Sequence, residues 1–331
     1  MLPEFIPSNK NSLLVIQSGD RNFEPDWHKS LSVCISGTID LSLAIHKILN
    51  EERQVDRLHG RTALVTGAAR GLGAQIVRRF AEEGAHVIVN DLNLTAAQET
   101  AKKYNGDAFA CDVSNSSEVD RMFLDIAAKG LEIDILVNNA GISGLEGDNQ
   151  AQERVRKSLK VAEASAKGEI PDIDPPILEV TDSAWSKMLA VHLDGTFFCS
   201  RAFVKNYRGS NSLNGLGRAI INMGSIMGTS GGAGSAAYCA AKAGILGLTR
   251  SLARELAPFK VRVNAIAPGY ILTDMTSPMA EMFPLLVAQT PQGRLGDPDD
   301  IAWAAVYLGS EEAKFVTGQT LSPNGGWHMS Q

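Results

Sequence analysis

The chain has 331 residues, of which 44% are hydrophobic and 21% charged, and its formal net charge is −6. This balance is typical of a globular protein and argues against a protein built to coat nucleic acid, which would normally show a basic face. The four cysteines stand far apart without a CxxC pair, so we expect neither a metal site nor a disulfide framework. No apolar stretch is long enough to span a membrane, and we expect a cytoplasmic protein.

Residues 1–56 read as an N-terminal extension without any motif that carries chemistry. Proline, glycine and asparagine interrupt its first part, which predicts irregular structure. Farther on, Leu41, Ala44, Ile45 and Ile48 recur at helical spacing and predict one amphipathic helix over residues 39–54. We expect an arm that packs on its own domain or on a neighbouring subunit.

From Arg61 onward, apolar runs of strand length alternate with helical patterns. The expected strands are Ala63–Thr66, Val87–Asn90, Ala108–Ala110, Ile133–Asn138 and Ala219–Met223. The expected helices are Gly73–Glu83, Leu94–Lys103, Glu118–Lys129, Ser183–Tyr207 and Ala236–Ala257. This alternation predicts an α/β fold over residues 57–331, a single domain with a Rossmann-type doubly wound parallel sheet and helices on both faces.

One long polar segment, residues 143–180, interrupts that rhythm. It combines a charged helical stretch, Gln150–Lys167, with prolines at 171, 175 and 176. Because it follows the carboxyl end of an expected strand, where such sheets bind ligands, we interpret it as a wall of the site entrance or an oligomer contact. A solvated helix with no such role is the competing interpretation.

A glycine-rich turn follows the first expected strand. Glycines at 67, 71 and 73, together with Arg70 and Leu72, lie between that strand and a helix. Glycine lets the backbone turn sharply and approach a pyrophosphate, which the helix N-terminus stabilises. We therefore expect Gly67, Arg70, Gly71, Leu72 and Gly73 to bind a dinucleotide, a purely structural turn being the alternative.

Asp91 ends the second expected strand. A carboxylate at this place accepts hydrogen bonds from the adenosine-ribose hydroxyls and repels a 2′-phosphate. It favours NAD over NADP as the cofactor, although the Arg70 cation could pair with a phosphate. A solvated loop residue is the other interpretation of Asp91.

Three residues form a second group with reactive chemistry: Ser225, Tyr238 and Lys242. Tyr238 and Lys242 are four positions apart in a helical stretch, so they share one helix face. A nearby ammonium stabilises a phenolate, and we therefore expect Lys242 to lower the pKa of Tyr238 toward a useful range. Ser225 follows an expected strand and could bind the reacting oxygen. By itself the Tyr–Lys pair could be an exposed helical pair.

Seven motifs in order give the chain, from about Arg61 to Gly326, a resemblance to the short-chain dehydrogenase/reductase family. The motifs are Thr66-Gly67-x-x-x-Gly71-x-Gly73, Cys111-Asp112-Val113, Asn138-Asn139-Ala140-Gly141, Asn222-x-Gly224-Ser225, Tyr238-x-x-x-Lys242, Pro268-Gly269-x-Ile271-x-Thr273, and Thr317-Gly318-Gln319 before Gly325-Gly326.

The resemblance implies a role for each matching residue. Tyr238 would be the general acid/base, Lys242 would lower its pKa and hold the nicotinamide ribose, and Ser225 would position the substrate oxygen. The remaining cofactor contacts would come from Asp112, Val113, Asn139, Ala140, Gly141, Pro268, Gly269, Ile271 and Thr273. The family's usual asparagine in the helix before the serine strand is replaced by His192, which either keeps a proton relay or is a packed histidine without a catalytic role.

The stretch after Thr273 holds Met275, Met279, Met282, Phe283 and Leu286. Methionine adapts to irregular apolar ligands, so we expect an apolar, cyclic or acyl-thioester substrate, ordinary helix packing being the alternative. The leading hypothesis is an NAD-dependent oxidoreductase that interconverts a secondary alcohol and a ketone. The alternatives are an NADPH-dependent ketoreductase resembling 3-oxoacyl-carrier-protein reductase and, more distantly, a non-catalytic dinucleotide-binding protein. From the family we expect a homotetramer, with a dimer as the alternative.

Overall fold

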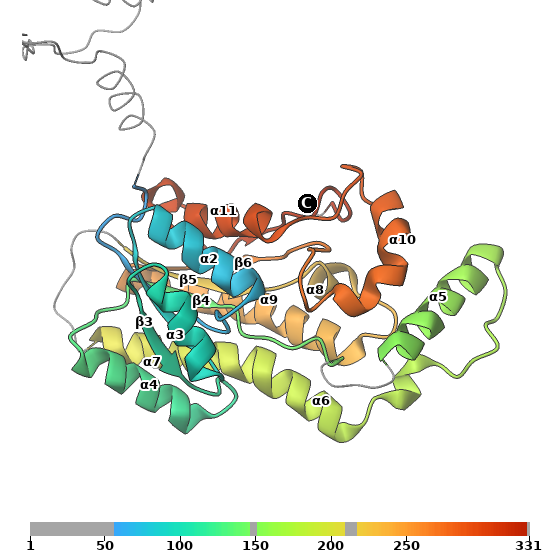
Figure 1. Cartoon of the computed structure of the whole chain (residues 1–331), viewed down its shortest axis with the longest axis horizontal. Helices are drawn as coiled ribbons and strands as arrows, with labels where there is room; N and C mark the ends of the chain where they lie inside the picture. Colours follow the sequence, from blue (N-terminus) through green and yellow to red (C-terminus); the bar gives the residue numbers. More distant parts are fainter. Residues whose placement is uncertain (1–55, 146–150, 209–216, 330–331) are drawn as a thin grey trace, which may run out of the picture. The chain divides into compact units, whose positions relative to one another are not determined.

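The computed structural model describes residues 56–145, 151–208 and 217–329. The expected N-terminal extension, with its helix over residues 39–54, lies outside the described residues. The described part belongs to one compact unit, Gln54–Gln331 (Figure 1). Among the described residues, no helix is long and apolar enough to cross a membrane.

Seven parallel strands form one sheet in the order β3-β2-β1-β4-β5-β6-β7. Their bounds are β1 (Thr62–Val65), β2 (His86–Asp91), β3 (Asp107–Ala110), β4 (Ile135–Asn138), β5 (Arg218–Met223), β6 (Val261–Ile266) and β7 (Thr320–Leu321). The chain runs outward from β1 to β3 and then returns to place β4 on the other side of β1. This reversal is the point where doubly wound sheets bind ligands, and the doubly wound prediction is confirmed.

The strands β6 and β7 are not among the five expected ones. In β6 the polar residues Arg262 and Asn264 interrupt the apolar run, although all but Arg262 are buried. The Asn264 side chain explains its own burial, because its amide donates to Val316 O (2.8 Å) and its oxygen accepts from Gln319 N (3.0 Å). Strand β7 has only two residues, too few for any periodicity to reveal it.

Helices cover both faces of the sheet. Their bounds are α2 (Gly71–Glu82), α3 (Leu94–Lys102), α4 (Ser116–Ala128), α5 (Ala151–Lys167), α6 (Asp182–Leu189), α7 (Gly195–Arg208), α8 (Met227–Ser230), α9 (Ala236–Leu256), α10 (Phe283–Ala288) and α11 (Pro298–Gly309). Side chains of α2, α3 and α11 pack in one core cluster, and those of α4, α7 and α9 in the other. Successive strand residues alternate between the two clusters, as the period of two in a strand requires: Ala63 and Val65 join the first, and Leu64 joins the second.

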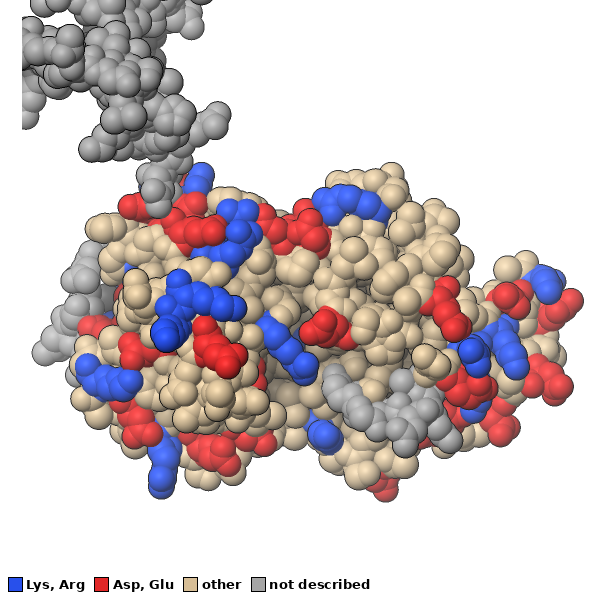
Figure 2. All heavy atoms as spheres, viewed as in Figure 1, with Lys and Arg blue, Asp and Glu red and all other residues tan. Residues whose placement is uncertain are grey.

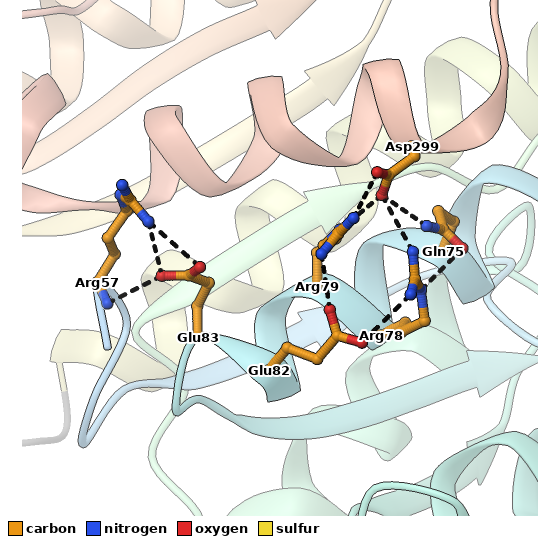
Figure 3. A network of polar contacts seen from close by, with 7 residues as sticks. All are labelled: Arg57, Gln75, Arg78, Arg79, Glu82, Glu83 and Asp299. Carbon is orange, nitrogen blue, oxygen red and sulfur yellow. Dashed lines mark hydrogen bonds and ion pairs between the residues drawn. The ribbon is translucent and has the colours of Figure 1, made fainter. Parts of the chain in front are cut away.

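A polar network fastens the glycine-loop helix α2 to α11. Asp299 on α11 accepts hydrogen bonds from Arg79 Nε (2.6 Å) and from Gln75 Nε2 (2.7 Å), and it also binds Arg78 (Figure 3). The hydrogen bond from Arg79 is the main reason why the pKa of Asp299 is lowered to about 2. Because α2 presents its N-terminus to the sheet edge, this network helps to hold that end in place.

The single helix expected over Ser183–Tyr207 is instead three consecutive segments. Between α6 and α7, residues Ala190–Asp194 form one turn of π-helix. A π-turn inserts an extra residue and is frequent at functional sites. The residue at the centre of this turn is His192.

Candidate active site

All the residues that the sequence singles out lie at the carboxyl edge of the sheet or on helices beside it. Consecutive strands place them as follows: Gly67 to Gly73 after β1, Asp91 at the end of β2, Asp112 and Val113 after β3, Asn139 to Gly141 after β4, Ser225 after β5, and Pro268 to Thr273 after β6. Tyr238 and Lys242 lie on α9, and His192 lies in the π-turn. The fold therefore brings together, at one edge of the sheet, residues that are spread over more than 200 positions of the sequence, from Gly67 to Thr273.

The glycine loop is packed so closely that two of its glycines leave no room for a side chain. A Cβ on Gly67 would lie 2.7 Å from Ala140 Cα, and Gly67 has a positive φ of 60°. A Cβ on Gly73 would lie 2.6 Å from both Gly67 O and Asn139 Nδ2. These contacts explain why glycine occupies both positions.

The N-terminus of α2 has no side-chain cap. Arg70 occupies the N-cap position, its side chain is exposed and makes no capping hydrogen bond, and the first turn has no acidic residue. The first amides of a helix need an acceptor, and the helix dipole favours a negative one. A helix start of this kind, approached by a glycine turn, fits a phosphate group.

Asp91 contacts the glycine loop directly. Its Oδ2 accepts a hydrogen bond from Ala69 N (3.1 Å), and Thr100 Oγ1 donates to Ala69 O (3.0 Å). Ala69 is therefore fastened through both backbone groups to β2 and α3. The partly exposed carboxylate of Asp91 lies beside the loop, in keeping with the expectation that it faces a bound ribose.

The Thr66 hydroxyl joins the ends of β1 and β4, a role that the sequence analysis does not assign. Its Oγ1 accepts from Asn139 N and Ala140 N, both at 3.0 Å. The Asn139 side chain in turn donates to Thr66 O (2.8 Å) and Gly67 O (3.0 Å). The Asn139-Ala140-Gly141 segment thus fixes the shape of the glycine loop.

A buried polar chain lies under the site; its two asparagines belong to motifs that the sequence singles out, whereas its serine and threonine do not. Asn138 Nδ2 donates to Asn222 Oδ1 (2.8 Å) and to Ser200 Oγ (3.1 Å), and Asn222 Nδ2 donates to Thr249 Oγ1 (2.9 Å). These four residues connect β4, β5, α7 and α9. Among the described residues Asn138 Oδ1 has no hydrogen-bond partner, but the three hydrogen bonds that do form join all four elements that carry the site.

Two further segments complete the edge. After β6, Ile226 N donates to Pro268 O (3.1 Å), and a Cβ on Gly269 would lie 2.7 Å from Asn324 Cα. Thr273 N donates to Thr276 Oγ1 (3.0 Å), which closes the turn that Ile271 begins.

After β3, Ser114 N and Oγ both donate to Asp112 Oδ1, at 2.9 and 2.7 Å, so this carboxylate shapes its own turn. Val113 is buried against Gly195, the first residue of α7.

Lys242 is buried, with 4% of its surface exposed, and its Nζ donates to Met223 O at 2.6 Å. The same Nζ lies 5.5 Å from the centre of the Tyr238 ring. Ser225 is also buried, and its Oγ accepts from Met227 N (3.1 Å). The ends of β5 and α9 therefore bring the three expected catalytic residues together.

The pKa of Tyr238 differs from the sequence expectation. Burial raises it to about 12, and the hydrogen bond with Ser225, which acts to lower it, does not overcome this effect. Burial also lowers the pKa of Lys242 to about 7, so its ammonium is weakened as an electrostatic partner. The phenol is consequently protonated at neutral pH, which is the form that donates a proton.

His192 is almost fully buried, with 2% of its surface exposed. Its Nε2 lies 3.1 Å from Ile142 N and 2.8 Å from Ile142 O. Depending on the tautomer, Nε2 therefore either accepts from the amide or donates to the carbonyl of Ile142. The ring stands edge-on to Tyr238, 5.3 Å between centroids, and a Cβ on Gly141 would lie 2.4 Å from its Cε1. Among the described residues, Nδ1 has no hydrogen-bond partner. Burial and the Lys242 charge lower the His192 pKa to about 3, so the ring is neutral.

A parallel doubly wound sheet, a glycine-lined helix N-terminus at its switch point and a Ser–Tyr–Lys group beside it define an α/β oxidoreductase of the dinucleotide-binding class. The short chain dehydrogenase family model matches residues 61–283, more than half of the chain. The chain belongs to this family, whose members bind a nicotinamide dinucleotide and act on CH–OH groups.

Curated relatives include 3-oxoacyl-(acyl-carrier-protein) reductases. That of Vibrio cholerae is 38% identical over 275 residues, covering 82% of this chain and 99% of the relative. That of Escherichia coli is 36% identical over 273 residues, covering 82% and 98%. Among solved structures, a gluconate 5-dehydrogenase from Burkholderia cenocepacia in complex with NADP and tartrate has a TM-score of 0.68 at 29% identity, covering 83% of this chain and 97% of its own. A short-chain type dehydrogenase/reductase from Mycobacterium marinum has a TM-score of 0.69 at 27% identity, with coverages of 84% and 99%.

Proposed function

We propose that the protein is an NAD(H)-dependent oxidoreductase that interconverts a secondary alcohol and a ketone. The observation that supports this most directly is the meeting of Ser225, Tyr238 and Lys242 at the same sheet edge as the glycine-lined loop. The non-catalytic alternative is disfavoured, because a protein that only binds a dinucleotide has no need to retain the serine, the tyrosine and the lysine together, with the lysine buried 5.5 Å from the tyrosine ring.

The bound nicotinamide would supply or accept the hydride at the substrate carbon. In ketone reduction Tyr238 donates its hydroxyl proton to the carbonyl oxygen, so that hydride and proton together make the alcohol. Ser225 donates a hydrogen bond to the same oxygen and orients it. Lys242, held by Met223 O, stabilises the resulting phenolate until solvent returns the proton. In alcohol oxidation the same steps run in reverse.

The backbone of the glycine loop and of the first turn of α2 fits the pyrophosphate of a dinucleotide. Gly67 and Gly73 let the loop backbone pack against Ala140 and Asn139 where no side chain would fit, and α2 begins with uncapped amides beside that loop. Gly67 to Gly73 would hold the pyrophosphate, Asp91 the adenosine ribose, Asp112 and Val113 the adenine, and Ile271 and Thr273 the carboxamide.

The choice of NAD over NADP rests on the charge of Asp91. The rival proposal is an NADPH-dependent ketoreductase, which is favoured by the similarity to 3-oxoacyl-(acyl-carrier-protein) reductases and by the NADP complex of the Burkholderia enzyme. The Asp91 carboxylate, fixed next to the loop through Ala69 N, argues against a 2′-phosphate at this position. The two proposals separate in a direct comparison of NADH and NADPH binding by fluorescence titration.

We predict that Asp91→Asn raises the affinity for NADPH about tenfold and changes that for NADH less than threefold. Asparagine keeps an oxygen that can accept from Ala69 N, so the loop stays anchored and only the charge is lost. At about 5 Å in water, a carboxylate and a phosphate monoester repel each other by about 1–2 kcal/mol. Equal NADPH affinity in the two proteins would show that Asp91 does not face the 2′ position.

His192 takes the place of the family's usual asparagine, and we propose that its neutral ring orders the proton path next to Tyr238. We predict that His192→Asn stays within a few-fold of wild-type kcat, because asparagine is also a neutral polar side chain. His192→Leu should lower kcat at least tenfold, because leucine offers no polar atom to the proton path. The affinity for NADH should not change. The comparison of kcat between the two variants checks this, and a collapse of turnover in His192→Asn would mean that the imidazole has a specific role.

The segment after Thr273 bears on the class of substrate. Met279, Met282 and Phe283 are partly buried in the segment after Thr273, and an apolar, cyclic or acyl-thioester substrate would suit them. A panel of cyclic alcohols, steroids, small 3-oxoacyl thioesters and polyols, each assayed with NAD(H) and NADP(H), tests the choice. Turnover of polyols alone would refute an apolar pocket.

We also propose that residues 57–331 form the catalytic domain and that this domain assembles as a homotetramer through α7 and α9, as is usual in the family. Phe197 on α7 is 40% exposed, with Arg201 over its ring, and in this assembly it would lie at the subunit interface. Light scattering of the purified protein gives the mass of the assembly. A monomer at micromolar concentration would exclude this arrangement.

A further inference from the structure

The insertion between β4 and α6 has a regular structure of its own and contacts the segment that follows Thr273. Helix α5 packs on the short 3-10 helix η4 (Ser277–Met282), which leads into α10 (Figure 1). An ion pair joins them, Arg156 Nη2 to Glu281 Oε1 at 3.6 Å. On α5, Val155 is buried, whereas Ala162 is exposed. The helix is therefore docked by one face rather than surrounded by solvent.

The same insertion also contacts the loop that precedes the catalytic tyrosine. A Cβ on Gly234, four residues before Tyr238, would lie 3.4 Å from Ser158 Oγ and 3.8 Å from Pro176 Cβ. Pro176 begins the 3-10 helix η1 (Pro176–Glu179), which is tied to α5 by the ion pair between Lys157 and Glu179. The two parts of the insertion thus reach this loop together.

The insertion consequently connects two segments that flank the reacting group. One is the loop before Tyr238, and the other is η4, which begins four residues after Thr273. At its start, Ile142 packs with Met188 and Tyr238 in one apolar cluster. A segment placed in this way narrows the approach to the Tyr238 hydroxyl.

The outer surface of the insertion has no single charge sign. Basic and acidic side chains are mixed over α5 at the right-hand end of the molecule in Figure 2. The described part of the insertion carries five basic side chains, all on α5, and six acidic ones on α5 and after it: Arg154, Arg156, Lys157, Lys160 and Lys167 against Glu153, Glu163, Glu169, Asp172, Asp174 and Glu179. A folded carrier protein that delivers a tethered substrate needs a surface of complementary charge at the entrance of the site. A surface that mixes both charge signs does not provide one.

We propose that the insertion restricts the enzyme to free, low-molecular-mass substrates, small thioesters included, and excludes substrates that are tethered to a carrier protein. This inference rests on the proposed function, and it separates the chain from the carrier-protein reductases to which it is similar. Exclusion acts on the approach of the substrate, so it changes kcat/KM for the tethered form and leaves the chemistry at Tyr238 untouched.

Two probes with one reacting ketone test the proposal: acetoacetyl-N-acetylcysteamine and acetoacetyl-acyl-carrier-protein, each with saturating NADH and with saturating NADPH. We expect kcat/KM to be at least tenfold lower for the carrier-borne ketone. Replacing residues 151–176 with a four-residue Gly-Ser linker should raise it at least tenfold for that probe. For the small thioester the same replacement should change kcat/KM less than threefold.

A point variant keeps the test valid where the replacement does not fold. Val155→Asp places a carboxylate in the buried face of α5 and should release the helix, raising kcat/KM for the carrier-borne probe at least fivefold. Ala162→Asp adds the same group on the exposed side of the same helix and should change it less than twofold. Equal effects of the two variants would contradict the proposal.

The inference is overturned if wild-type protein uses the carrier-borne ketone as well as the small one. It is equally overturned if the small thioester is inert while other alcohols are turned over in a Tyr238-dependent way. Neither result affects the proposed function, which fails on a different observation: turnover that survives the loss of the Tyr238 hydroxyl.

Discussion

Replacing Tyr238 with phenylalanine is expected to lower kcat for both directions by about 10²–10⁴-fold, the usual contribution of a general acid/base. The change removes only the hydroxyl, so the edge-on contact with His192 and the apolar packing with Met188 persist. Affinity for NADH should stay within a few-fold, because the glycine loop is not touched. Steady-state kinetics and fluorescence titration on the same preparation give the two numbers.

Tyr307→Phe is the matched control for this experiment. Tyr307 lies on α11 with 39% of its surface exposed, and the same hydroxyl loss there should leave kcat unchanged. Unchanged turnover in Tyr238→Phe would refute the proposed mechanism, whereas a loss of NADH affinity equal to the loss of kcat would point to a collapsed site instead.

Much of the fold follows from local patterns. The five expected strands and the helices at α2, α3, α4 and α9 agree with the structure to within two residues at each end. The strands were predictable because each run is short, mainly apolar and bounded by turn residues, and the helices because their apolar residues recur at helical spacing. Strand β6 was not, since Asn264 looks polar in sequence and becomes acceptable inside only through its bonds to Val316 and Gln319.

The site shows the same division between local and long-range information. The glycine loop and the Tyr238–Lys242 spacing depend on neighbours in sequence, and the structure places them as expected. The sign of the pKa shift of Tyr238 depends on burial by segments far along the chain, so the favourable effect of Lys242 alone gave the wrong direction. The π-turn around His192 was also beyond sequence reasoning, because the periodicity of residues 183–207 is helical throughout.

Binding of the dinucleotide should depend most strongly on Gly73. We predict that Gly73→Ala weakens NADH binding about 10–100-fold, because a methyl group 2.6 Å from Gly67 O and from Asn139 Nδ2 forces the loop backbone to move. Overpacking of this kind costs about 1–3 kcal/mol, and here it displaces the amides that would hold the pyrophosphate. The melting temperature of the ligand-free protein should fall as well, since Asn139 loses its bond to Gly67 O.

Gly247→Ala supplies the reference for that measurement. Gly247 lies within α9, and apart from the adjacent helix backbone no described atom lies within 4 Å of an added Cβ. Alanine should therefore raise helix stability by up to about 1 kcal/mol and leave NADH affinity unchanged. The two substitutions are chemically identical and differ only in the space around them. If Gly73→Ala bound NADH as tightly as Gly247→Ala does, the backbone near Gly73 would not be part of the phosphate cradle, and the dinucleotide would have to approach the sheet edge by another route.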